Sequence, residues 1–220
     1  MAANLAEVQG IRASLGGGTQ HIVAAQLKAA YPFYNMDEIV AGNHNLIDEG
    51  YFDGGTMFDW WKKSARERGV EYLAGEVASM TLNAAGSSVD SVTLANGDVI
   101  SCGTVVNASG PRAKLTAAMA GIDLPVEPRK RYTFIFDAAE PLDRDLPLTI
   151  DPSGVHMRSD GRYYLAGCPP DDDGPLHYDG FAADHAIWEQ TVRPVLAHAV
   201  PACETSERDD LCVGHAACTA

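Results

Sequence analysis

Apolar residues recur at helical spacing between Asn4 and Tyr31. Leu5, Val8 and Ile11 share one side of a helix, and a second apolar set runs from Ile22 to Tyr31. This spacing predicts two short helices, separated by the glycines at 16–18. The triplet does not suit a phosphate-binding loop, because no β-branched strand precedes it and neither GxGxxG nor GxxxxGK[ST] is matched. We therefore expect a linker between helices there.

A longer helix is predicted from Thr56 to Gly69. Thr56 is a suitable N-cap with Asp59 at the capping-box position, and Gly69 suits the left-handed residue beyond the helix end. Trp60 and Trp61 belong to an apolar stripe opposite a charged face. Such an aromatic stripe usually packs in a protein core, so we expect the same here.

After this helix the apolar pattern changes to alternation. It predicts strands at residues 70–73, 76–82, 89–94 and 98–101, and Asn96-Gly97 is a strong hairpin signal that makes the last two antiparallel. The β-branched run at 104–107 is typical of a buried strand in a parallel sheet. It ends on Ala108-Ser109-Gly110, and a helix is predicted to follow from 111 to 120.

From residue 126 onward the pattern favours an antiparallel sheet. Strands are predicted at 131–136, 148–150, 155–158 and 162–166, with turns at 152–154 and 159–161. A helix with a kink before Pro194 should cover residues 184–199. The predicted architecture thus changes near residue 124 from mixed α/β to antiparallel sheet plus helix.

Charge and composition exclude several classes of protein. The formal net charge is −14 and the isoelectric point is near 4.7, which disfavours binding to nucleic acid phosphates or anionic lipid. No apolar run approaches the roughly 20 residues that span a bilayer, and no basic-then-apolar secretory signal begins the chain. The five cysteines have no CxxC pair and no zinc-site spacing, so no metal site is predicted. We expect a protein of the cytoplasm, or of the mitochondrial matrix in a eukaryote.

Several phrases, in this order along the chain, resemble the D-amino-acid oxidase and sarcosine oxidase group of FAD-dependent oxidoreductases. The resemblance covers about residues 30–202. The phrases are DEGYFD at 48–53, SARERGV at 64–70, VVNASGPRA at 105–113, LPVEPRKR at 124–131, LPLTIDPSGVH at 146–156 and YLAG at 164–167. Single phrases are modest signals, but chance rarely places so many in one order.

The resemblance implies a mixed α+β and α/β fold with two parts. One is an incomplete FAD-binding, Rossmann-like domain with a β-meander, and the other is an antiparallel-sheet substrate domain. We assign 1–50 to a helical connecting region of the substrate domain, 51–123 to the partial FAD-binding domain, 124–202 to the substrate sheet and 203–220 to a divergent tail. In the family, a strand and a GxGxxG loop hold the pyrophosphate, and this motif is missing here. A truncated, frameshifted or rearranged gene product would have such a sequence.

The same resemblance gives candidate cofactor residues. In the family, the strand and turn equivalent to Asn107, Ala108, Ser109 and Gly110 approach FAD, and small side chains let the backbone come close. The alternative from the residues alone is an ordinary strand-to-helix turn whose glycine supplies a positive φ. Val77 corresponds to a position where main-chain groups lie beside the adenine, and its alternative is a buried strand valine.

No catalytic residue is assigned, but five side chains on the predicted sheet are substrate-side candidates. Because alternation sends about half of a strand's side chains to each face, only some of the five can face a substrate. A lone strand histidine such as His156 is more often structural, although it suits a proton acceptor at neutral pH. The candidates are Arg131, Tyr132, His156, Arg158 and Tyr164.

Two functions follow from the resemblance. The first is a fragment of an oxidoreductase that oxidises an amine or amino acid by hydride transfer to flavin, inactive alone and dependent on a complementing chain. The second is a non-catalytic interaction or assembly protein that retains the fold. Both imply a small-molecule or protein partner, without nucleic acid and without a membrane span.

Overall fold

A computed structural model of the chain describes residues 2–45, 47, 50–170, 172–204 and 207–219. These residues form two units, each built from separate stretches of sequence. The first unit contains residues 1–51, 131–172 and 181–214, and the second contains 52–130, 173–180 and 215–220. None of the helices in the described residues has the length and apolar character needed to cross a bilayer.

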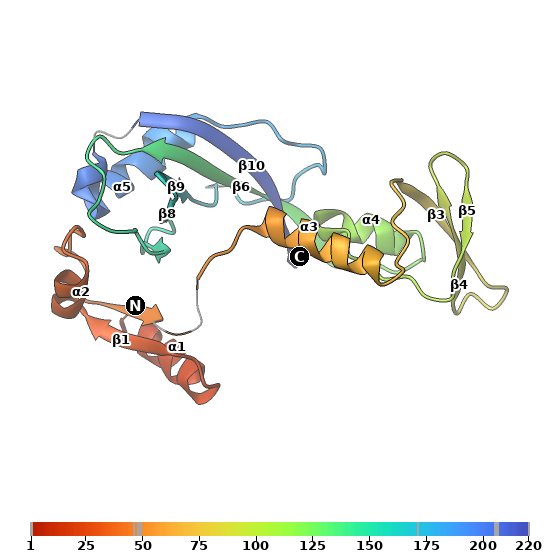
Figure 1. The fold of residues 1–220 in the computed structure, drawn as a ribbon, viewed down its shortest axis with the longest axis horizontal. Helices are drawn as coiled ribbons and strands as arrows, with labels where there is room; N and C mark the ends of the chain where they lie inside the picture. The colour runs from red at the N-terminus through yellow and green to blue at the C-terminus, as the bar shows by residue number, and fades with distance from the viewer. Residues whose placement is uncertain (1, 46, 48–49, 171, 205–206, 220) are drawn as a thin grey trace. The chain divides into compact units, whose positions relative to one another are not determined.

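The first unit is built on an antiparallel sheet (Figure 1). Its strand order is β10-β6-β9-β8-β7, and β6 and β10 each extend into the second unit. In register, Phe134 lies opposite Ala166, and Met157 also lies opposite Ala166 from the other neighbouring strand. The strands are β6 (Val126–Asp137), β7 (Thr149–Ile150), β8 (His156–Asp160), β9 (Tyr163–Gly167) and β10 (Glu207–Thr219). The predicted sheet is therefore confirmed, with β10 as an added strand that the pattern did not predict.

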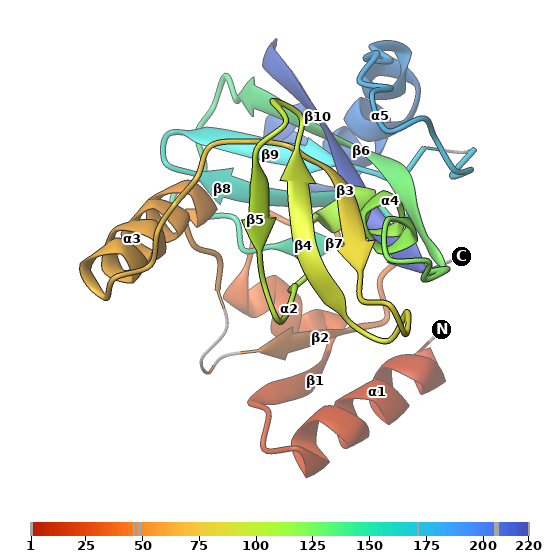
Figure 2. The same ribbon diagram turned by 90° about the vertical axis from the view of Figure 1, so that its right-hand side faces the viewer.

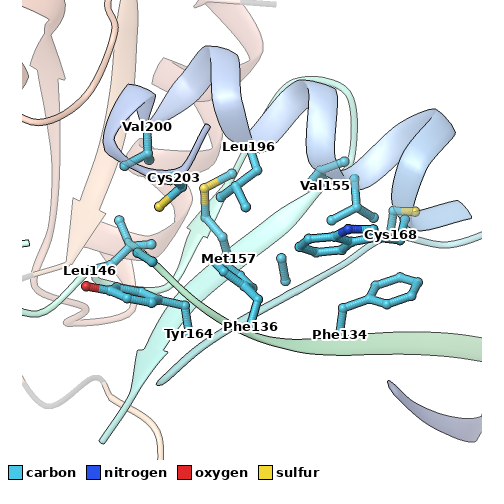
Figure 3. Packing of buried hydrophobic residues seen from close by; sticks show 14 of the residues in the cluster. Phe134, Phe136, Leu146, Val155, Met157, Tyr164, Cys168, Leu196, Val200 and Cys203 are labelled. Carbon is cyan, nitrogen blue, oxygen red and sulfur yellow. The ribbon is translucent and has the colours of Figure 1, made fainter. Parts of the chain in front are cut away.

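One face of this sheet forms the core against a helical segment. The segment consists of a π-helical turn, η2 (Trp188–Val192), then α5 (Arg193–Ala199) and the 3₁₀ turn η3 (Pro201–Cys203). Figure 3 shows Phe136 and Met157 extending from the strands toward the helical segment that carries Leu196 and Val200. These four residues and Phe134 are fully buried. The predicted kink near Pro194 is thus a change from π-helix to α-helix, with the proline in the first turn of α5.

The N-terminal part of the first unit differs from the prediction. It contains α1 (Ala2–Ser14), β1 (Thr19–Val23), α2 (Ala24–Ala30) and β2 (Ala41–Asn45), and β1 pairs antiparallel with β2. The prediction of helix at Ile22 and Val23 was wrong. Their β-branched side chains favour a strand, and β2 supplies a partner that only the tertiary fold brings near.

The second unit contains a long helix and a three-stranded meander (Figure 2). The helix is α3 (Gly54–Glu67), and the meander has the order β3 (Val77–Leu82), β4 (Val89–Leu94), β5 (Val99–Ser101). The helix and the meander are confirmed, but the prediction that the aromatic stripe of this helix packs in a core was wrong, because Trp60 and Trp61 are 73% and 60% exposed. The predicted N-cap was wrong: Asp53 caps α3, because its carboxylate accepts from the Thr56 amide at 3.1 Å and also from the Thr56 hydroxyl.

Two predicted strands of the second unit are absent from the described structure. Residues 70–73 and 104–107 are irregular and largely exposed, and Val106 is 85% exposed. A parallel strand forms only where neighbouring strands pair with it, and the second unit offers no parallel sheet among its described residues. The chain continues from 107 into a 3₁₀ turn, η1 (Gly110–Arg112), and α4 (Ala113–Ala118).

Candidate functional site

The candidate residues fall into two groups, one in each unit. Val77 and residues 107–110 belong to the second unit, and the substrate-side candidates belong to the first. The two groups are treated separately below.

The turn at Asn107–Gly110 is fixed by its own side chains. The Asn107 side-chain amide donates to the Ala113 carbonyl at 2.8 Å, and its oxygen accepts from the Ser109 amide at 3.2 Å. The Ser109 and Thr116 hydroxyls lie 2.8 Å apart. Gly110 has a positive φ of 56°, and a Cβ there would meet nothing within 4 Å. Asn107 therefore shapes the turn, and a ligand would meet mainly the exposed backbone and small side chains of the turn.

Val77 lies at the free edge of the meander. It pairs with Leu94, while the Ala95 amide donates to the Glu76 carbonyl at 2.8 Å. This pattern makes Val77 and Leu94 a non-hydrogen-bonded pair, so the main-chain N–H and C=O of Val77 point away from β4. No strand pairs with β3 on that side within the described part of the chain. The main-chain groups of Val77 therefore face the unpaired edge of β3.

Alternation divides the five substrate-side candidates into two sets. Tyr132 and Tyr164 are each 5% exposed and belong to the core, and the Tyr164 hydroxyl accepts from the Leu142 amide at 3.0 Å. Burial, with Asp184 nearby, raises the pKa of Tyr132. These two tyrosines are therefore structural residues rather than substrate contacts, because they occupy the core face of their strands.

The other three candidates lie on the opposite side of the sheet. We call this side the outer face; it is not the face that packs on α5. It carries Arg131, Thr133 and Ile135 of β6, His156 and Arg158 of β8, and Leu165 of β9. Arg158 lies opposite Leu165, which in turn lies opposite Ile135, so the three strands present one continuous surface.

His156 lies over Gly167 on the outer face. The two residues are paired in register, and a Cβ on Gly167 would be 3.1 Å from the Cε1 and Nε2 atoms of the imidazole. Burial lowers the pKa of His156 below its ordinary 6.5, opposed in part by a hydrogen bond with the Gly154 backbone. The imidazole is therefore neutral at pH 7 and can accept a proton.

Arg158 is held between a carboxylate and an aromatic ring. Its Nη1 donates to Asp160 Oδ1 at 2.8 Å and to the Ser159 carbonyl at 2.9 Å. Its Cζ lies 4.2 Å from the centre of the Tyr51 ring, a cation–π contact. Arg131 also has an interaction within the chain.

Sequence reasoning missed Tyr51 and Gly167 as members of this surface. Both lie inside phrases that carry the family resemblance, 48–53 and 164–167. A tyrosine or a glycine at these positions does not by itself indicate that the residue belongs to the outer face. Only the strand pairing and the ring stacking place them beside His156 and Arg158. In the described residues, no three His, Cys, Asp or Glu side chains are grouped as metal ligands.

The family follows from a comparison of the whole sequence. The model of the family described as FAD dependent oxidoreductase matches residues 1–214. The chain belongs to this family. It is 30% identical over 209 residues to FAD-dependent oxidoreductase domain-containing protein 1 of Xenopus laevis, covering 82% of this chain and 42% of that relative. It is 27% identical to the Mus musculus protein of the same name, covering 86% and 45%.

Solved structures share the fold. L-proline dehydrogenase from P. horikoshii superposes with a TM-score of 0.81 at 24% identity, over 94% of this chain and 54% of that one. Glycine oxidase from Bacillus cereus gives a TM-score of 0.72 at 13% identity, over 99% and 57%. The fold class is therefore that of the FAD-dependent oxidases, which have a Rossmann-like fold, and the described residues of this chain form mixed helices and antiparallel sheets. The chain spans less than half the length of the curated relatives above.

The residues of the second unit fit part of an FAD site. The edge of β3 offers the Val77 main chain to an adenine, and the turn at 107–110 offers exposed backbone with no bulky side chain. The sequence contains no GxGxxG motif, the element in which backbone amides at a helix N-terminus bind a pyrophosphate. The Val77 main chain and the turn at 107–110 would meet part of FAD, and the pyrophosphate would need a binding element that this sequence does not contain.

Proposed function

We propose that this chain is part of an oxidoreductase that oxidises an amine or an amino acid with FAD. The observation that carries the proposal is the family match over residues 1–214, which includes the turn, the meander and the outer face. L-proline dehydrogenase and glycine oxidase, which share the fold, are named for amino acids. FAD, when bound, supplies the acceptor for a hydride from the carbon beside the substrate nitrogen.

The chain's own residues have two tasks in this function. The Val77 main chain and the backbone of residues 107–110 hold FAD. The outer face orients the substrate. An arginine of this face binds a negatively charged group of the substrate, and His156 accepts the proton of the amine. Fixed orientation of the reacting carbon is the main contribution that a protein makes to such chemistry.

A further polypeptide segment completes the flavin domain in this proposal. Two stretches with strand patterns, 70–73 and 104–107, are irregular, and Val106 is 85% exposed. The stretch 104–107 has the pattern of a strand in a parallel sheet and needs parallel neighbours in order to form one. A segment containing a strand and a GxGxxG turn would provide these neighbours together with the pyrophosphate site.

The apolar surface of α3 is a second docking place for that segment. None of its residues is buried in the second unit, and Trp60 and Trp61 are 73% and 60% exposed. A groove of about 280 Å³ has aromatic walls of Phe58, Trp61 and Tyr72, with Lys62 4.0 Å from the centre of the Tyr72 ring. Exposed apolar patches of this kind mark interaction surfaces, so the completing segment should carry apolar side chains.

The segment comes from one of two sources: a further stretch of the same protein, or a separate complementing chain. In either case the assembled protein is the form to test. Amines and amino acids are added to it without oxygen, after FAD has been bound, and the oxidised-flavin absorbance is followed. The proposal expects at least one amino acid or amine to remove this absorbance. Persistence of the absorbance with every compound would favour the non-catalytic alternative, an interaction or assembly protein.

A further inference from the structure

Residues 173–180 form a loop that belongs to the second unit, although the chain before and after it belongs to the first. We call these residues the crossing loop. Contacts with residues far away in the sequence hold it on the second unit. The Leu176 amide donates to the Pro128 carbonyl at 3.2 Å, and Arg129 donates through Nη1 to the Asp173 carbonyl. Both contacts are made near the start of β6, so this strand fixes one end of the loop.

The other end of the crossing loop makes an ion pair with η1. Arg112 donates through Nη2 to Asp179 Oδ1, and its Cζ lies 5.9 Å from the centre of the Tyr178 ring. The Gly180 amide donates to the His177 carbonyl at 2.9 Å, which closes a turn around Asp179. The Asp179 amide in addition donates to His177 Nδ1 at 3.3 Å. An ordered turn therefore presents the carboxylate to Arg112.

Arg112 is joined directly to the turn at 107–110, the candidate for contact with FAD. Its amide donates to the Ser109 carbonyl at 3.1 Å. The residue between Gly110 and Arg112 is a proline, whose ring fixes φ and makes this connection stiff. Two hydrogen bonds thus link Asp179 to Ser109 through a single residue.

The turn needs such support at its second end. Asn107 fixes the first end through its bonds to the Ala113 carbonyl and the Ser109 amide. At the second end Gly110 has a φ of 56°, and a glycine adopts positive and negative φ values about equally readily. The position of this end therefore depends on what holds the residues that follow. The side chains of the Arg112–Asp179 pair are 50% and 64% exposed, and so exposed a pair adds little to stability, so its main consequence here is geometric.

We propose that the crossing loop is a third part of the FAD site, beside the edge of β3 and the turn at 107–110. Asp179 holds Arg112, and Arg112 holds the second end of the turn in the place where it meets FAD. Both are positioning residues, because they act through the backbone of the turn. The assignment rests on the proposed function, since it concerns the cofactor of that oxidoreductase.

Hydrogen exchange in the full chain tests the link without any cofactor. The Arg112 amide, which donates to Ser109, is followed by NMR in the unchanged chain and in Asp179→Asn. The substitution removes the charge at nearly constant size and should speed exchange of this amide about threefold. Asp143→Asn is the matched control, because Asp143 pairs with Arg144 and these side chains are 66% and 51% exposed. It should leave the exchange rate of the Arg112 amide unchanged.

Titration of FAD into the assembled protein tests the consequence for the cofactor. Asp179→Asn and Arg112→Gln should each raise the dissociation constant of FAD about threefold. The double variant should bind no more weakly than either single variant, because both substitutions remove the same interaction. Arg112→Lys keeps the charge and should bind FAD nearly as tightly as the unchanged protein. All these variants should unfold at the same denaturant concentration as Asp143→Asn, which separates positioning from general stability.

The assignment is overturned if the Arg112 amide exchanges in Asp179→Asn as slowly as in the unchanged chain, or if Asp179→Asn binds FAD as tightly as Asp143→Asn. Effects that add in the double variant would show that the two side chains act separately, against the proposed link. An assembled protein whose FAD affinity follows these substitutions but which oxidises no amine or amino acid would refute the proposed function alone. Oxidation together with equal FAD affinity of all the variants would refute this assignment alone.

Discussion

At the residue scale, Gly167 is the position where a side chain has the least room. A Cβ there would clash with the Tyr132 carbonyl oxygen and would also press on the His156 ring. The first neighbour is backbone of β6 and cannot rotate away, so a larger residue must distort the pairing of β6 with β9. The glycine thus maintains both the sheet and the place of His156.

We expect Gly167→Ala to lower the free energy of unfolding by about 1–3 kcal/mol, the usual cost of overpacking. Denaturant unfolding followed by circular dichroism measures this change. Gly103→Ala is the control, because a Cβ at Gly103 meets nothing within 4 Å. A Gly167→Ala protein as stable as the control would show that β6 does not approach Gly167 so closely.

His156 makes stability depend on pH in a defined direction. Burial lowers its pKa in the folded chain below 6.5, and the unfolded chain keeps the ordinary value. As the pH falls through 6.5, the unfolded state binds the proton first, so the free energy of unfolding falls until the pH passes the lower, folded pKa. His156→Gln should remove this part of the pH dependence in unfolding measured at a series of pH values. An unchanged slope would mean that the ring is not desolvated.

The sequence could predict that some of the candidates share one face of the sheet, but not which residues form the outer face. Alternation alone states that about half of the five candidates share a face, and the structure places Arg131, His156 and Arg158 there. Which half faces the core depends on where α5 packs, and that is a tertiary contact. Tyr51 precedes Arg158 by 107 positions, and no local pattern relates the two residues.

At the element scale, the η2–α5 segment stabilises the sheet of the first unit. Leu196 and Val192 are fully buried against the core face, and the Trp188 ring lies 5.3 Å from that of Phe134. We expect Leu196→Ala to cost about 2–5 kcal/mol of unfolding free energy, because it leaves a cavity in this core.

Leu148→Ala provides the comparison for that substitution. Leu148 is 58% exposed, so its truncation should change stability by no more than about 0.5 kcal/mol. Thermal or denaturant unfolding of the two variants gives the difference. Equal stabilities would show that the helical segment does not pack on the sheet as described.

Local sequence signals predicted an element well where the caps, turns and hydrogen bonds that stabilise it come from residues close in the sequence. The helix at α3, the Asn96-Gly97 hairpin and the strands of the antiparallel sheet follow from caps, turns and alternation. The failures are elements that depend on distant partners. Ile22 and Val23 form a strand because β2 lies beside them. The stretch 70–73 pairs with no described strand, and 104–107 lacks the neighbours that a parallel strand needs.

At the scale of the whole molecule, the two units differ in how completely they bury their apolar residues. The core cluster lies in the first unit, whereas the second exposes Phe58, Trp60, Trp61 and Val106. Apolar side chains of this size are normally covered in a working protein. The chain spans less than half the length of the curated relatives reported above, and its sequence contains no GxGxxG motif.

Titration of FAD, followed by its fluorescence, tests the central claim most directly. We expect the cofactor to bind when the chain is assembled with a segment carrying the strand and GxGxxG turn, and to bind poorly to the chain alone. Val106→Asp should weaken binding about tenfold, because it introduces a charge where the completed sheet is buried, whereas Val99→Asp, in the far strand of the meander, should not. Failure of the assembled protein to bind FAD, or equal binding by the chain alone, would contradict the claim.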